Sequence, residues 1–257
     1  MPLGIPFRFK EASSRSRHRS DWYRHGNPPL GLKLGDDADE IDLDLTLEKY
    51  VLAKHFLSSI LENLAKTKGL KLGDFITDGG RDRLVLASGG VARDFLAIFR
   101  RSIDVARQRV MEKKTARGEK IGTEDVNIAA GEYEPSKKED FKRDASEDRD
   151  KLIDFFNKIR DFCLTKAIAN CFLLDKDAEG AEVQMIHELV DLKLLHFARA
   201  RVTVSKRVGK IFEAYMLDLS QYAGARKKRD LESIEFWRSE SEEAIRRVGL
   251  IYTPSNL

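Results

Sequence analysis

The chain has 257 residues, of which 42% are hydrophobic and 35% are charged, and its formal net charge is +3. This length allows one large domain or two small ones, and the hydrophobic content is sufficient for a buried core. Two cysteines and six prolines exclude a disulfide scaffold and a collagen-like chain. No apolar run approaches the roughly 18 residues of a membrane span, and no secretory signal is recognisable. The sequence therefore predicts a cytoplasmic protein with no membrane partner.

The first 40 residues are predicted to be irregular. The segment contains prolines and a mixture of serine and arginine, and it has no periodic apolar pattern. The segment is either a disordered arm or a piece of a larger domain, and Trp22 and Tyr23 favour the second, because disordered arms are poor in aromatic residues. Six acidic residues and no basic residue follow between positions 36 and 44.

Residues 41–131 are predicted to form a helical unit. Apolar residues recur at helical spacing over 47–64, and a second long amphipathic helix is predicted over 91–114. Between them, a turn at 78–80 leads to a short helix over 82–87. Thr123 is the expected N-cap of a further helix.

A charge-dense linker is predicted over 132–145, because this segment contains Pro135 and almost no large apolar residue. Residues 146–230 then show the element order of a winged-helix domain. The predicted elements are helices over 146–166 and 182–197, a strand over 170–174, and a hairpin with strands over 201–205 and 212–219. Residues 231–257 are expected to end the chain as a helix over 234–248. The predicted fold class is mainly α, a helical bundle followed by an α+β winged-helix domain with a short β-hairpin.

Basic side chains gather where a winged helix contacts DNA. From Lys193 to Arg229 there are ten basic residues and two acidic ones. In this interpretation 182–197 is the recognition helix and 201–219 is the wing. The predicted nucleic-acid-binding residues are Lys193, Arg199, Arg201, Lys206, Arg207 and Lys210, with a second cluster of Arg226, Lys227, Lys228 and Arg229.

Two observations keep a protein partner open as an alternative to DNA. Winged helices often bind proteins, and the fold by itself does not decide between the two. In addition, Glu182, Glu188 and Asp191 lie on the predicted recognition helix and weaken the case for insertion into the major groove.

Motifs for other chemistry are absent from the sequence. It contains neither G-x-x-x-x-G-K-[ST] nor G-x-G-x-x-G, which excludes a phosphate-binding loop of either kind. His187 and Glu188 begin a zinc motif whose second histidine is replaced by Asp191. Cys163 and Cys171 are expected to be buried thiols. We therefore predict no catalytic residue and no metal site.

The stretch from Ser88 to Arg93, Ser-Gly-Gly-Val-Ala-Arg, is similar to the sensor-2 region of AAA+ ATPases of the origin-recognition or replication-initiator type. The flanks agree, because residues 41–47 resemble the start of the helical lid and residues 121–129 resemble the helix that closes it. The similarity covers residues 40–130. It departs from the family pattern at Gly90, where the family often has Asp.

The resemblance implies that Arg93, with Gly89 and Gly90, contacts the phosphates of ATP in an intact ATPase. The spacing of the residues alone favours a second interpretation, in which Arg93 only lies on a solvated helix face. The resemblance shifts the balance toward contact with phosphate. It also implies that residues 1–40 are the end of the ATPase core, with Arg17 and Arg19 as candidate sensor or inter-subunit arginines.

The segments that bind the nucleotide in such ATPases, Walker A and Walker B, are not in the sequence. The chain therefore resembles the C-terminal part of an AAA+ ATPase, with residues 41–131 as the lid. We expect ATP and Mg²⁺ to bind only when an upstream ATPase core is present. This chain alone is expected to bind neither cofactor and to hydrolyse no ATP.

The sequence leaves functions of different classes open. The first is the C-terminal part of an AAA+ ATPase, with a lid that senses nucleotide phosphate and a winged helix that binds DNA or a protein partner. The second is a stand-alone helical module that binds protein or forms a homo-oligomer. A winged-helix transcription regulator would need a dimer interface, and no heptad pattern supplies one.

Overall fold

The structure is a computed structural model that describes residues 45–114, 116, 118–144, 149–224, 231–238 and 241–254. The chain divides into the segments Met1–Leu43 and Asp44–Leu257, and the described residues all belong to the second. Arg17 and Arg19 lie outside the described residues, as does the cluster of Arg226, Lys227, Lys228 and Arg229.

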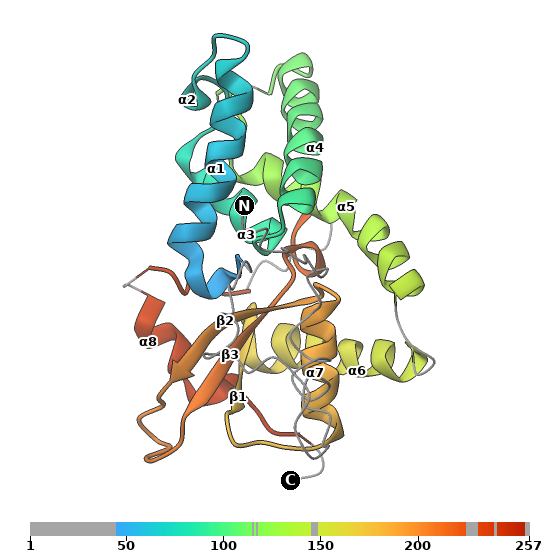
Figure 1. Ribbon diagram of the computed structural model, residues 1–257, viewed down its shortest axis with the longest axis vertical. Helices are drawn as coiled ribbons and strands as arrows, with labels where there is room; N and C mark the ends of the chain where they lie inside the picture. The colour runs from blue at the N-terminus through green and yellow to red at the C-terminus, as the bar shows by residue number, and fades with distance from the viewer. Residues whose placement is uncertain are drawn as a thin grey trace, which may run out of the picture. The chain divides into compact units, whose positions relative to one another are not determined.

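Helices dominate the described chain, which confirms the prediction of a mainly α fold. The N-terminal elements are the 3-10 turn η1 (Leu47–Lys49) and the helices α1 (Tyr50–Lys66), α2 (Leu72–Phe75), α3 (Asp78–Ser88), α4 (Ala92–Met111) and α5 (Thr123–Asp144) (Figure 1). Helix α3 packs against α1, α4 and α5, so these helices form a bundle. Among the described residues, no helix has both the length and the apolar character that a bilayer crossing requires.

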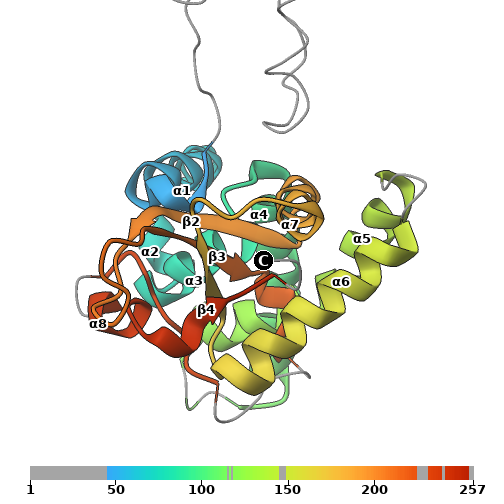
Figure 2. The ribbon, with the colours of Figure 1, turned by 90° about the horizontal axis from the view of Figure 1, so that it is seen from below.

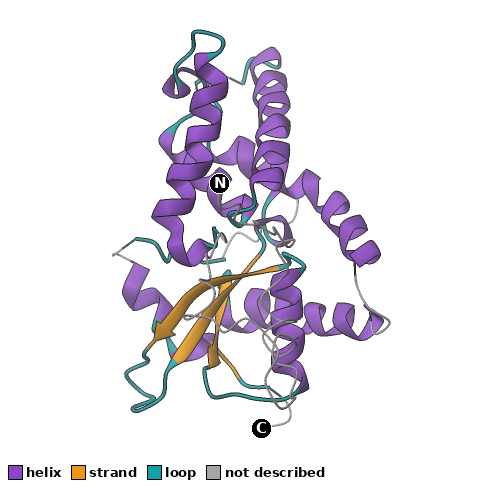
Figure 3. Ribbon diagram, viewed as in Figure 1, coloured by secondary structure: helices purple, strands orange, loops and turns teal. Residues whose placement is uncertain are grey.

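A small mixed sheet follows the bundle in the chain (Figure 3). Its elements and neighbours are α6 (Arg149–Asp161), a π-helical turn (Phe162–Ala167), β1 (Cys171–Asp175), α7 (Ala181–Asp191), β2 (Leu195–Val202), β3 (Phe212–Leu217), α8 (Glu242–Ile245) and β4 (Ile251–Tyr252). The strand order is β2-β3-β1-β4. Strand β3 pairs antiparallel with both β1 and β2, and β4 pairs parallel with β1.

Helix α3 begins earlier than its apolar pattern predicts. The turn expected at 78–80 is the first turn of the helix, because the Thr77 hydroxyl accepts a hydrogen bond from the Gly80 N–H. Such a side-chain cap satisfies a backbone donor that the first turn leaves open. The helix ends at Ser88, and its C-cap Gly89 has a φ of 58°, the left-handed conformation that glycine adopts without strain.

The predicted linker at 132–145 is wrong for residues 132–144, which continue α5. Pro135 lies inside this helix, and it is exposed. Tyr133 and Lys137, on the other side, are buried. The buried face of this half of α5 is therefore polar and aromatic, so the apolar pattern that indicates a helix is missing from the sequence.

Helix α7 ends six residues before its predicted end at 197, and the strand expected over 201–205 begins earlier. Lys193 has a φ of 59°, and this left-handed residue reverses the chain into β2 at Leu195. The apolar residues Leu194, Leu195 and Phe197 fit a helix or a strand equally well by periodicity.

The helix predicted for 231–257 is wrong as well. The described residues there contain the four-residue α8, a 3-10 turn and the short strand β4. The C-terminal segment is fixed by contacts with the sheet and with the residue before β1. The Ile234 N–H donates to the Asn170 side chain over 2.8 Å, and Tyr252 of β4 stands beside Leu174 of β1.

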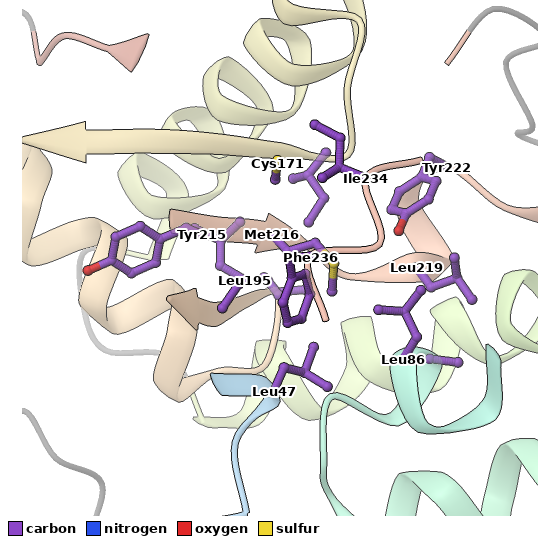
Figure 4. Close-up of a cluster of buried hydrophobic side chains, with 14 of the residues drawn as sticks. Leu47, Leu86, Cys171, Leu195, Tyr215, Met216, Leu219, Tyr222, Ile234 and Phe236 are labelled. Atoms are coloured by element: carbon purple, nitrogen blue, oxygen red, sulfur yellow. The ribbon is translucent and has the colours of Figure 1, made fainter. Parts of the chain in front are cut away.

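The bundle and the sheet share one hydrophobic core. Leu47 and Leu86 from the bundle lie close to Leu195 and Met216 of the sheet and to Phe236 of the C-terminal segment (Figure 4). Figures 1 and 2 show β2 passing below the start of α1, where it contacts η1. The sequence elements assigned to two successive domains thus belong to one compact unit.

Candidate nucleic-acid interface

A groove lies between the loop that joins β2 to β3 and the C-terminal segment. It has a volume of about 870 Å³. One wall is the loop 203–211 and the other is formed by 243 and 246–249. Residue 201 also lines the hollow, and we call the whole hollow the β2–β3 groove. The loop turns at Gly209, whose φ of 81° suits glycine.

Basic side chains dominate the lining of the β2–β3 groove. Glu243 is the acidic residue among the lining residues. The basic ones are Arg201, Lys206, Arg207, Lys210, Arg246 and Arg247. The structure therefore brings four of the sequence-predicted residues together and adds two arginines that the sequence analysis missed. Arg246 and Arg247 join the groove only through folding, since the C-terminal segment is distant in sequence from the loop.

The basic residues of the groove differ in whether they have partners. Lys210 pairs with Asp175, Arg246 with Glu242 at 3.1 Å and Arg247 with Glu232 at 2.6 Å. In the described part of the chain, the side chains of Arg201, Lys206 and Arg207 have neither a hydrogen bond nor an ion pair, and all are exposed. These cations are free to neutralise an anion.

The tip of the loop between β2 and β3 carries an exposed apolar residue, Val208. Val208 is 94% exposed and stands between Arg207 and Gly209. An apolar side chain at this position contributes nothing to the core. One cation, Arg207, precedes Val208, and proteins that bind the minor groove of a duplex combine basic side chains with inserted apolar ones.

Two predicted nucleic-acid-binding residues do not line the groove. Arg199 donates to Glu242 over 3.0 Å and to the Phe236 carbonyl over 2.6 Å, so it ties β2 to the C-terminal segment. Lys193 occupies the exposed corner between α7 and β2. DNA contact by either residue stays a prediction.

The glycine pair before α4, Gly89 and Gly90, allows other parts of the chain to pack closely against the backbone. A Cβ added to Gly89 would lie 2.1 Å from Cε1 of His196, and one added to Gly90 would lie 1.8 Å from the Leu45 carbonyl oxygen. The space beside both glycines is thus filled by atoms of this chain. The backbone at Gly89 and Gly90 does not fit an open cradle for the phosphates of ATP.

Arg93 is placed differently from the glycines. It lies in the first turn of α4, and its side chain is 68% exposed. Its Nε is 3.2 Å from Oδ1 of Asp94, which is buried. An exposed guanidinium at the start of a helix fits an arginine that reaches an anion outside this unit.

A buried cluster that the sequence analysis missed connects the bundle to the sheet. We call Asp94, Tyr133, Lys137, His196 and Asp218 the charged junction. Lys137 Nζ donates to Asp218 Oδ2 over 2.5 Å and lies 3.7 Å from Asp94 Oδ2. The Tyr133 hydroxyl donates to Asp94 over 3.2 Å, and His196 Nε2 is 2.9 Å from Asp218 Oδ2. The junction therefore joins α4, α5, β2 and the residue after β3.

Protonation in the charged junction follows from burial and pairing. Burial favours a raised pKa for Asp218, but Lys137 and His196 beside it hold the pKa well below its usual range. Burial lowers the pKa of His196, and the neighbouring Asp218 opposes this only in part. We therefore assign an ionised Asp218 and a neutral His196 at pH 7.

The predicted burial of both cysteines is confirmed. Cys163 and Cys171 are free and buried, and burial raises the pKa of Cys171 to about 12. In the ranges that the structure describes, no group of three His, Cys, Asp or Glu side chains is placed to hold a metal ion.

Comparisons of this chain with protein-family models, with curated protein sequences and with solved structures found no match.

Proposed function

We propose that this chain is the C-terminal part of an AAA+ ATPase of the origin-recognition type and that its winged-helix domain binds DNA. The observation that carries the DNA-binding proposal is the β2–β3 groove, in which six basic residues and one acidic residue line one hollow. Three of these six, Arg201, Lys206 and Arg207, have no partner among the described residues, and phosphates are ligands that such unpaired cations neutralise.

The order of elements supports a winged-helix domain. Helix α6, strand β1, helix α7 and the hairpin of β2 and β3 follow one another, and β3 lies between β2 and β1 in the sheet. In such a domain the loop between β2 and β3 is the wing. The cations with free side chains, Arg201, Lys206 and Arg207, lie on or beside that loop.

The exposure of Arg93 supports the ATPase part of the proposal. In an intact ATPase, an upstream core would hold ATP and Mg²⁺, and Arg93 would supply positive charge to the nucleotide phosphates. Translation of the genomic DNA upstream of the Met1 codon tests this. We expect a G-x-x-x-x-G-K-[ST] segment followed by an acidic strand end, and a reading frame without either would remove the ATPase part.

A binding assay tests the DNA-binding part. We expect the full chain to bind a fluorescein-labelled DNA duplex, measured by fluorescence anisotropy, with an affinity that falls steeply with KCl concentration. Each phosphate neutralised contributes about 0.9 to the slope of log affinity against log salt. The variant Arg201→Gln/Lys206→Gln/Arg207→Gln should lose affinity and reduce the slope by about 2 to 3.

A charge-matched control separates the groove from net charge. Lys66, Lys68 and Arg107 are exposed cations on α1, after α1 and on α4, outside the groove. The variant Lys66→Gln/Lys68→Gln/Arg107→Gln carries the same net charge as the groove variant and should bind DNA almost as the unmodified chain does. Equal losses in the two variants would contradict a role for the groove.

A protein-binding module is the second candidate, and α1 favours it. Val51 is 79% exposed, Leu52 is 54% exposed and Phe56 is 44% exposed on the same helix. Adjacent exposed apolar side chains of this size are typical of an interface. If the module forms a homo-oligomer through α1, sedimentation equilibrium will show an assembly that Val51→Asn/Phe56→Asn dissociates, and the chain will not bind DNA.

A further inference from the structure

Helix α7 has the position of a recognition helix but lacks the charge of one. Between Ala181 and Asp191 the sequence has no lysine or arginine. It has three acidic residues, Glu182, Glu188 and Asp191. A helix in the major groove lies between two rows of phosphates, and α7 brings no positive charge of its own to them.

The exposed positions of α7 also provide little for reading bases. They are Ala181, Gln184 and His187, spaced three residues apart on one side of the helix. Arginine and lysine make the commonest specific contacts to base edges and are absent, and Gln184 is the exposed residue of α7 that can pair bidentately with an adenine. The start of α7 is held from two sides, since Glu182 accepts from Lys158 over 2.6 Å and from the Tyr252 hydroxyl over 2.8 Å.

The β2–β3 groove has the opposite character. Six of its lining residues are basic, one is acidic, and no aromatic residue is among them. Proteins that bind single strands stack the bases on aromatic side chains. A groove with cations and without a stacking platform suits the sugar-phosphate backbone of a duplex, in which the bases are already stacked.

We propose that the chain binds duplex DNA through the β2–β3 groove alone, with α7 held away from the duplex, and that binding is independent of base sequence. This inference rests on the proposed DNA-binding function and specifies its mode. The free cations Arg201, Lys206 and Arg207 contact phosphates, and Val208 at the loop tip contacts the floor of the minor groove.

The test compares two surfaces of the full chain on three probes. The probes are two fluorescein-labelled duplexes of equal length and base composition but unrelated sequence, and one of their single strands. The groove variant is Arg201→Gln/Lys206→Gln/Arg207→Gln, and the α7 variant is Gln184→Ala/His187→Ala. All five residues are exposed, and circular dichroism checks that both variants are folded.

The expected result separates the two surfaces. The unmodified chain should bind both duplexes with affinities within about threefold, far from the factor of about 10³ or more that separates specific from non-specific sites. The single strand should bind more weakly than either duplex. The groove variant should lose at least about tenfold in affinity, and the α7 variant should stay within about twofold of the unmodified chain.

Other outcomes overturn the inference, and they distinguish it from the proposed function. If the α7 variant loses as much affinity as the groove variant, or if one duplex is preferred by more than about 100-fold, α7 reads the DNA and only the mode of binding is wrong. Preference for the single strand also overturns the mode alone. If the unmodified chain binds none of the probes, the proposed DNA-binding function fails as well.

Discussion

The charged junction and the β2–β3 groove are built from the same kinds of residue and differ in their surroundings. Lys137 in the junction is 7% exposed and faces two carboxylates. Lys206 and Arg207 in the groove are exposed, and their side chains have no partner among the described residues. A buried cation must be paired and therefore holds elements together, whereas an unpaired surface cation stabilises little and is available for a ligand.

Substitution of the central cation should show the largest effect. In Lys137→Met, Asp218 and Asp94 lose the ammonium group that compensates their burial. We expect the free energy of unfolding, measured by urea denaturation, to fall by about 3–5 kcal/mol. The control Lys66→Met, at an exposed position on α1, should change it by less than about 0.5 kcal/mol. Similar values for the two variants would mean that the junction does not stabilise the fold.

The glycine turn beside the junction should show the next largest effect. In Gly90→Ala the new Cβ meets the Leu45 carbonyl oxygen, which is backbone and moves only with the chain, at a φ of 88°. We expect a loss of about 2–3 kcal/mol in thermal or urea unfolding. Gly69→Ala is the matched control, because Gly69 also has a positive φ, 68°, but has no atom within 4 Å of an added Cβ. If Gly90→Ala and Gly69→Ala destabilise the protein equally, the clash with the Leu45 carbonyl oxygen is absent.

The histidine of the junction should make stability depend on pH. Its folded-state pKa is lowered, so below its usual value near 6.5 the unfolded chain takes up a proton that folded His196 does not. The free energy of unfolding therefore falls as the pH falls from 7 to 5, by at most about 1.4 kcal/mol per pH unit. Asp218, Lys137 and Lys193 are the charged groups that act on the pKa of His196.

The variant His196→Gln has no group that titrates at this position. Its free energy of unfolding, measured at a series of pH values, should decline less between pH 7 and pH 5 than that of the unmodified chain. Parallel curves for the two proteins would show that His196 is protonated in the folded state as readily as in the unfolded state.

The smallest effect on stability is expected in the groove. Arg201→Gln/Lys206→Gln/Arg207→Gln removes three exposed cations without partners among the described residues. We expect the midpoint of urea denaturation to change by the equivalent of about 0.5 kcal/mol or less. A large loss of stability would mean that these cations stabilise the fold, as the junction residues do. Their effect on DNA binding would then be indirect.

The elements that the sequence predicted well have recognisable apolar patterns. Helices α1 and α4 bury a periodic apolar face against the core, and strand β3 is an apolar run buried at all positions but that of Glu213. The second half of α5 was missed, because its buried residues include Tyr133 and Lys137. No pattern within 132–145 reveals that Asp218, far along the chain, compensates the charge of this lysine.

The candidate site was predictable only where its residues are consecutive. The basic loop is visible in the sequence as a run of lysine and arginine around Gly209. Arg246 and Arg247 reach the same groove only because the C-terminal segment packs beside the sheet. Conversely, Arg199 belongs to the basic run but is used within the protein, in an ion pair with Glu242.

The core that Leu47 and Leu86 share with Leu195 and Phe236 has a consequence for how the protein denatures. Two domains joined by a linker melt in separate steps, whereas elements that bury one another melt together. We therefore expect scanning calorimetry of residues 44–257 to give a single endotherm whose calorimetric and van't Hoff enthalpies agree. Cooperativity of this kind means that the bundle and the sheet persist or are lost as one body.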